Sequence, residues 1–336
     1  MSDSSAVRVL IDDRIRLMSA ALAATNYPQT AQDRKRHHAH AHARQTMKYL
    51  ADNGHKNHEA IVQLQAMLDK GVSLQQLFSV VMTWPFPGLV ANVLPSWMPP
   101  QWNRALWDFY ESSALAEFWS SSQSHKAWDD ALNQATRILA KTHFKALLES
   151  FLGPIHQELL FVPNISYPAD NEVGAQTDTQ LISIVPPPLA WGESPPWPYD
   201  EETNITHSYR AALFQYSRLL LTAYLRQHED RMAEISQREL PVTEQMKAKY
   251  PTWEDQFIVL FNSAAVAIYL EDYVSKAEAN AYILMEKRTH GMTLLPGTIS
   301  VLRRFLQERG HKFNGLIDFL PVFPSQLRVA KRIVTM

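Results

Sequence analysis

The chain contains no cysteine. This absence excludes a disulfide framework, a cysteine-ligated zinc ribbon, an iron–sulfur cluster and a thiol nucleophile. Any bound metal would have to be held by nitrogen and oxygen ligands, and the 13 histidines are the first candidates to consider.

Glycine and net charge are also scarce. Only 10 of the 336 residues are glycine, and there is no Walker loop, no glycine-rich dinucleotide fingerprint and no G-x-S-x-G elbow. Folds in which the backbone must approach a bound cofactor closely are therefore disfavoured. Lysine plus arginine number 32 and aspartate plus glutamate 34, so the net charge is 32 − 34 = −2. We expect no nucleic-acid partner, because no excess of positive charge exists to bind phosphate.

Long hydrophobic runs are missing as well. The longest, such as residues 257–270, is interrupted by Asn262 and Ser263 and falls short of the roughly 20 residues that span a bilayer. Charged residues interrupt the first 18 positions, which therefore lack the apolar core of a signal peptide. We expect a cytoplasmic protein without a membrane span.

Helical periodicity dominates what is present. Ile11, Ile15, Met18 and Leu22 step by three and four residues, which predicts a helix that ends near Tyr27. Similar patterns predict further helices over 37–52, 57–69, 73–82, 102–120, 125–150, 205–237, 253–272, 275–289 and 296–309.

Two short apolar runs, 159–162 and 181–185, predict buried strands separated by a turn-rich stretch. Two proline-rich segments flank this region, an ordered aromatic connection over 84–102 and a crossing loop after 185. The prolines near residue 320 predict an extended C-terminal segment. The fold class is therefore mostly α (α+β). A helical region, 1–150, precedes a region over 151–336 with the β element and C-terminal helices, and the two could form one continuous domain.

A histidine tract lies near the N-terminus. His38 and His42 are four residues apart and would share a helix face that could chelate a metal ion. The adjacent cations of residues 34–36 would repel that ion, so a solvated polar face is the competing interpretation. The tract and its neighbours comprise His37, His38, His40, His42, His55 and His58.

His207 stands where a zinc-peptidase helix would place its first ligand. Such a helix carries His-Glu-x-x-His, with two imidazoles on the metal and the glutamate activating water. Here Ser208 replaces the glutamate and Ala211 the second histidine. Glu254, in the first turn of a later predicted helix, could supply a carboxylate ligand, although a first-turn carboxylate also stabilises a helix dipole.

Aromatic residues cluster around the proline-rich segments. Such residues could line a groove for a peptide or sugar, or they could be core. The candidate groove residues are Trp191, Trp197, Tyr199 and Tyr209.

The order of these pieces resembles a bacterial family of zinc-metallopeptidase-like domains. The matching text is DDRIRLMSAALAATNY (12–27), DFYESSALAEFWSSSQSHKAW (108–128), SFLGPIHQELLFVPN (150–164), TWEDQFIVLFNSAAVAIYL (252–270) and RRFLQERGHKFNGLIDFLPVF (303–323). The resemblance implies a zinc site on a His-Glu-x-x-His helix with a later glutamate ligand. Only His207 and Glu254 remain at those positions, without a general base.

The residues thus predict a catalytically degenerate member of that family, with no catalytic residue, no required cofactor and a binding or scaffold role toward a protein or peptide. Two alternatives stay open. One is an active metal-dependent hydrolase in which zinc is held at a rebuilt site using His207, Glu254, Glu229 or another histidine. The other is a helical interaction module unrelated to peptidases.

Overall fold

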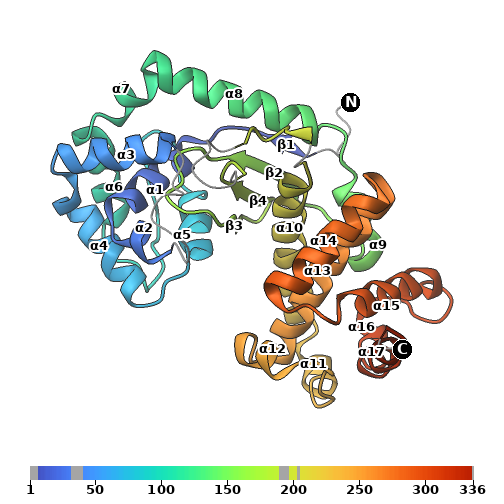
Figure 1. The fold of residues 1–336 in the computed structure, drawn as a ribbon. Coiled ribbons are helices and arrows are strands. Elements are labelled where there is room, and N and C mark those ends of the chain that lie inside the picture. Colours follow the sequence, from blue (N-terminus) through green and yellow to red (C-terminus); the bar gives the residue numbers. More distant parts are fainter. Residues whose placement is uncertain (1–6, 32–40, 189–196, 203–204, 335–336) are drawn as a thin grey trace. The chain divides into compact units, whose positions relative to one another are not determined.

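The computed structural model describes residues 7–31, 41–188, 197–202 and 205–334. Figure 1 shows these residues as helices with one small four-stranded sheet, which confirms the mostly α (α+β) fold class. The chain divides into two compact units. The first unit comprises residues 7–141 and 157–208, and the second comprises 142–156 and the described part of 209–336. Composition predicted a division at residue 150. In the structure, the strands that follow residue 150 lie in the same unit as the N-terminal helices.

Helix α1 is the centre of the first unit. Asp12 caps it by accepting a hydrogen bond from the Arg14 backbone N–H at 2.9 Å, and the Arg14 guanidinium donates to the carbonyls of Met82 (2.8 Å) and Trp84 (3.1 Å). Helix α1 spans Asp13–Ala24. The other helices of this unit are α2 (Tyr27–Thr30), α3 (Ala41–Asp52), the 3-10 turn η1 (His55–Asn57), α4 (Glu59–Asp69), α5 (Leu74–Val81), α6 (Trp102–Ser112), α7 (Leu115–Ser120) and α8 (Ser122–Leu139).

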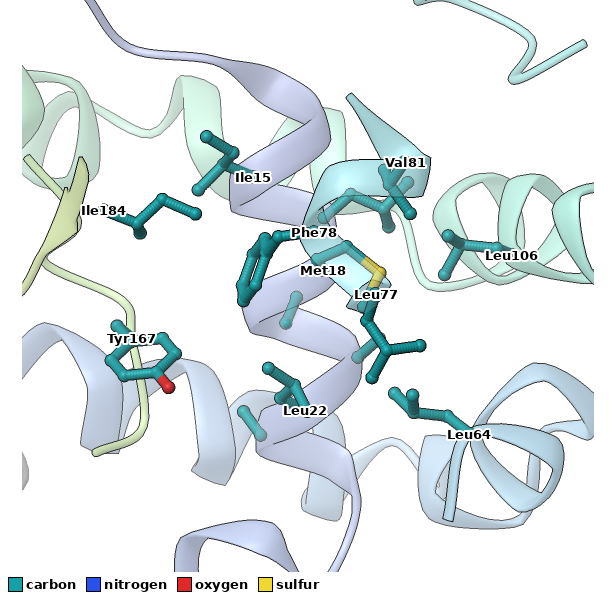
Figure 2. Close-up of a cluster of buried hydrophobic side chains, with 14 of the residues drawn as sticks. Ile15, Met18, Leu22, Leu64, Leu77, Phe78, Val81, Leu106, Tyr167 and Ile184 are labelled. Atoms are coloured by element: carbon teal, nitrogen blue, oxygen red, sulfur yellow. The ribbon is translucent and has the colours of Figure 1, made fainter. Parts of the chain in front are cut away.

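The predicted apolar stripe of α1 lies in the core of the first unit. Ile15, Met18 and Leu22 are at most 1% exposed. Figure 2 shows them among side chains of other helices and of the sheet, including Phe78 of α5 and Ile184. Burial extends around the whole of α1 from Leu17 onward because small alanines let neighbouring elements approach every side of the helix.

The sheet has strand order β1-β2-β4-β3. β1 (Arg8–Val9) is parallel to β2 (Glu158–Pro163), and β2 is parallel to β4 (Gln180–Val185), whereas β3 (Val173–Gln176) is antiparallel to β4. The two predicted strands are confirmed as β2 and β4. β3 lies inside the stretch interpreted as turns, and a short turn joins it to the start of β4.

The proline-rich connection between α5 and α6 is ordered by aromatic packing, as predicted. The rings of Trp84 and Trp102 lie 6.1 Å apart, and both residues are buried. The Trp102 indole N–H donates to the carbonyl of Ala60 at 3.1 Å, and the Asn103 amide donates to the carbonyl of Leu89 at 2.8 Å. The Asn103 bond thus satisfies a backbone carbonyl outside any helix or strand, and the Trp102 bond ties α6 to the first turn of α4.

The second unit is entirely helical where it is described. Its central helix is α13 (Trp253–Tyr273), which is buried from Gln256 to Leu270 apart from Ile258. Around it are α9 (Phe144–Leu152), most of α10 (Ile205–Gln227), α11 (Glu229–Ile235), α12 (Glu244–Lys249), α14 (Lys276–His290), α15 (Leu295–Glu308), α16 (Leu316–Phe319) and α17 (Phe323–Val334). Among the described helices none is long and apolar enough to cross a membrane.

The predicted extended C-terminal segment is wrong, because α16 and α17 occupy it. Pro324 falls in the first turn of α17, where a helix has no intrahelical partner for the backbone N–H that proline lacks. Phe323 at the start of α17 is buried, with its ring 5.1 Å from that of Phe257.

Candidate functional site

A pocket lies in the first unit at the carboxyl ends of its two central parallel strands. We call it the carboxyl-edge pocket; its volume is about 420 Å³. Ile165 follows the end of β2 by two residues, and Pro187 follows the end of β4 by two. Parallel strands bring their carboxyl ends to one edge, where α/β sheets most often bind ligands. The remaining lining residues are Ala41, His42, Ala127, Asp130, Ala131, Gln134, Trp197, Pro198 and Tyr199.

Tyr199 fixes the loop that closes this pocket. Its hydroxyl donates to the carbonyl of Val185 at 2.6 Å and accepts from the N–H of Asn164 at 3.1 Å, so it joins the ends of β4 and β2. Its backbone N–H donates to Gln134 of α8 at 3.2 Å, and its carbonyl accepts from the hydroxyl of Ser208 at 3.1 Å. Burial raises the pKa of Tyr199 well above its usual value, so the hydroxyl stays protonated.

A partly buried imidazole, that of His42, also lines the pocket. The ring of His42 lies 6.0 Å from Trp128, edge to face, and 6.3 Å from Phe118. Burial, followed by the positive charge of Arg16, lowers the pKa of His42 to about 4. The Arg16 guanidinium lies 4.2 Å from the ring centre of Trp119 and 4.7 Å from that of Trp128. His42 is therefore neutral at pH 7.

Ser124 and His42 bear on whether the described lining of the pocket could supply a nucleophile and a base. The hydroxyl of Ser124 lies 3.5 Å from His42 Nε2, but Ser124 is only 3% exposed and does not line the pocket. An imidazole with a pKa of about 4 is also a weak general base at neutral pH. These groups do not make a nucleophile–base pair.

The structure brings together two of the four predicted groove residues. Trp197 and Tyr199 both line the carboxyl-edge pocket. Tyr209 belongs to the second unit, where its ring lies 5.7 Å from Phe144 and 5.9 Å from Tyr269. Trp191 lies outside the described residues.

The two predicted metal ligands fall in different units. His207 lies in the first turn of α10 within the first unit, and Glu254 in the first turn of α13 within the second. Thr252 caps α13, since its hydroxyl accepts from the Asp255 N–H at 3.0 Å, and Glu254 lies in the same first turn. Within the described residues, no three His, Asp or Glu side chains are grouped to hold a metal ion. A metal role for His207 and Glu254 stays a prediction.

The histidine tract separates into different environments. His37, His38 and His40 lie outside the described residues, so the pairing of His38 with His42 does too. The solvated interpretation is wrong for His42 and for His58. The side chain of His58 is only 15% exposed, and its Nδ1 accepts the Ala60 N–H at 3.2 Å, which caps α4. Its Nε2 lies 3.1 Å from Asp108 and, as the protonated nitrogen, donates to it.

Replacing His58 with alanine is expected to lower the free energy of unfolding by about 1 kcal/mol, because the first turn of α4 loses its capping acceptor. Urea denaturation followed by tryptophan fluorescence measures the loss. His58→Asn, which keeps an acceptor, should recover most of it, and the exposed neighbour Lys56→Ala should change stability by less than about 0.5 kcal/mol. Equal losses in His58→Ala and Lys56→Ala would contradict the capping role.

A second, larger hollow of about 830 Å³ lies beside the β3–β4 turn. The end of α5, residues 93–95 and the polar turn 176–180 line it. Val93 is 85% exposed, and Trp84 is turned into the core at 3% exposure. This hollow holds no partly buried titratable group comparable to His42 among its lining residues, and its one charged lining residue, Asp178, is exposed. We therefore take the carboxyl-edge pocket, which does hold such a group, as the candidate site.

Sequence reasoning missed the α8 side of the pocket. Ala127, Asp130, Ala131 and Gln134 are spaced by three and four residues, so they share one face of the helix. Two alanines beside a carboxylate and an amide leave room for a ligand. The spacing of these four residues is the sequence signal that could have indicated the α8 wall of the pocket. Comparisons of the chain with protein-family models, with curated proteins and with solved structures found no match.

Proposed function

We propose that this chain is a non-catalytic binding protein on a metallopeptidase-like fold, and that its carboxyl-edge pocket takes a short apolar segment of a protein or peptide. One observation carries the proposal: Trp197 and Tyr199, from the proline-rich loop, meet α8 and His42 in one pocket at the carboxyl ends of β2 and β4. Apolar walls with a few convergent polar groups are typical of binding sites.

The shape and composition of the walls favour a peptide. Pro187, Pro198 and Trp197 present rigid apolar surfaces, which bind extended proline-rich or aliphatic segments at little entropic cost. A volume of about 420 Å³ accommodates a few side chains rather than a folded domain. Gln134 is already fixed by Tyr199, so the loop and α8 form a prepared surface.

The residue at the place of the family's general base supports the non-catalytic role. Ser208 is fully buried, and its hydroxyl holds the carbonyl of Tyr199. Ala211, at the place of the second ligand, is also fully buried. In an active member of the family, a glutamate at this position would activate water. Here Ser208 stands in its place and supports the loop of the binding pocket.

Replacing Trp197 with alanine is expected to weaken peptide binding at least tenfold, because the pocket loses its largest partly exposed aromatic surface. The measurement is selection of random peptides displayed on phage against the full-length chain, followed by isothermal titration of the enriched peptides. Trp97→Ala is the matched control, since Trp97 is also partly exposed and lies outside the pocket lining.

Two results would contradict the proposal. One is a selection in which the wild-type chain enriches no peptide above the Trp197→Ala variant. The other is zinc-dependent peptidase activity of the purified chain that is lost in His207→Ala, which would favour the active hydrolase instead.

A further inference from the structure

The charged side chains in the described lining of the carboxyl-edge pocket are of negative sign only. Asp130 is the one acidic side chain among its described lining residues, and no lysine or arginine is among them. Asp130 has no ion-pair partner among the described residues, whereas its neighbour Asp129 pairs with His125 at 3.3 Å. An incoming ligand therefore meets an uncompensated carboxylate on the α8 wall.

Two arginines of the first unit, Arg137 and Arg16, already have acidic partners. Arg137 of α8 forms an ion pair with Asp200, which directly follows Tyr199 in the closing loop. Arg16, behind His42, is paired with Asp13 at 2.9 Å. His42 itself is neutral at pH 7 because burial and Arg16 lower its pKa to about 4. Among the described lining residues, Asp130 is thus the one carboxylate, and no cation lies beside it in the lining.

An aromatic surface adds to this preference. Trp197 is partly exposed on the closing loop and lines the same pocket as Asp130. The face of an indole attracts a cation, and tryptophan does so more strongly than the other aromatic residues. Lysine and arginine also have apolar stems that can lie along such a surface while the charged end stays near water.

We infer that the ligand segment carries a lysine or arginine, whose stem lies along Trp197 and whose cationic end pairs with Asp130. This inference rests on the proposed function. The ion pair is solvent-exposed and the cation–indole contact is partly so, so the two together are expected to favour a basic residue over an uncharged residue of equal length by about tenfold.

The test extends the phage selection to the full-length chain with Asp130→Asn and, as matched control, Asp129→Asn on the same helix. Wild type and Asp129→Asn should enrich peptides with lysine or arginine at one shared position, and Asp130→Asn should lose that enrichment. In isothermal titration, replacing this lysine with norleucine should weaken binding to the wild type about tenfold. The difference should shrink in Asp130→Asn and at about 1 M salt.

The outcomes separate the inference from the proposed function. Enriched peptides without a basic preference, or with an acidic one, would overturn the inference and leave the binding function intact. A basic preference that persists in Asp130→Asn would overturn the assignment to this carboxylate. A selection with no enrichment above Trp197→Ala would overturn the proposed function, and the inference with it.

Discussion

Replacing Phe78 with alanine is expected to lower the free energy of unfolding of the first unit by about 3–5 kcal/mol. Phe78 is fully buried on α5, and its ring lies 6.4 Å from that of Tyr167 (Figure 2). Removing the ring costs its transfer from water and leaves a cavity that the surrounding helices can fill only in part. Phe78 is among the largest fully buried side chains of the protein, so few single substitutions would remove as much packed surface.

Tryptophan fluorescence is the suitable measurement for this variant. Eight of the nine tryptophans, all except Trp253, lie in the residue ranges of the first unit, so urea denaturation followed by fluorescence reports mainly on that unit. Phe78→Leu should lose less, and Val62→Ala on α4, where Val62 is 57% exposed, should change stability by less than about 0.5 kcal/mol. A loss below about 1 kcal/mol for Phe78→Ala would contradict the tight packing of this core.

Acidification is expected to destabilise the first unit by up to about 3 kcal/mol through His42 alone. The pKa of His42 is about 4 in the folded chain, against an ordinary value of 6.5. As the pH falls below 6.5, the unfolded chain binds a proton at this position that the folded chain does not. The contribution of His42 is therefore fully present above pH 6.5 and is lost progressively as the pH falls toward 4.

Stability measured between pH 7 and pH 4 tests this expectation. The slope of unfolding free energy against pH should be smaller in His42→Gln than in the wild type. His125→Gln, on α8, serves as the exposed control, since the His125 side chain is 72% exposed. Titration of the His42 ring by NMR gives the direct value, and Arg16→Met should raise this pKa. A His42 titration near pH 6.5 would contradict the burial of this ring.

Periodicity predicted most helices but not their interruptions. The helix predicted over 102–120 is divided into α6 and α7 at Ala114, whose φ of 47° is left-handed. Alanine is the strongest helix former, so local propensity could not indicate a break there. The break lets Leu115 and Trp119 enter the core while Tyr49 donates to the carbonyl of Ser113 at 2.7 Å. Tertiary contacts outweighed propensity at this point.

The strands show a similar limit to what sequence patterns can predict. β2 and β4 are continuous apolar runs, which are recognisable because both faces of these strands are buried. β3 is a four-residue strand, VGAQ, without such a run. It exists because β4 offers a paired edge across a short turn, where the Thr177 N–H donates to the Gln180 carbonyl at 2.9 Å. Pairing, rather than composition, makes it a strand.

The candidate site could be predicted only in part for the same reason. Trp197 and Tyr199 were recognisable as large aromatic residues beside prolines. The prediction for His42 was wrong, because its cationic sequence neighbours indicated a solvent-exposed side chain. Phe118 and Trp128, which are distant from it in the chain, pack against its ring and bury it. The place of Asp130 in a pocket whose described lining has no lysine or arginine depends on which residues the fold brings together, and sequence spacing carries no such information.

By itself, the sequence determined the helical class, the central strands, the exclusion of thiol chemistry and the absence of a His-Glu-x-x-His pattern at His207, where Ser208 and Ala211 stand instead. These follow from composition, periodicity and the identity of single residues, which are local properties. Only the tertiary structure decided that Ser208 supports Tyr199, and that the loop carrying Trp197 meets α8 and His42 at the ends of β2 and β4. Burial and pairing depend on residues distant in the chain, so the pocket exists only once the sheet has brought them together.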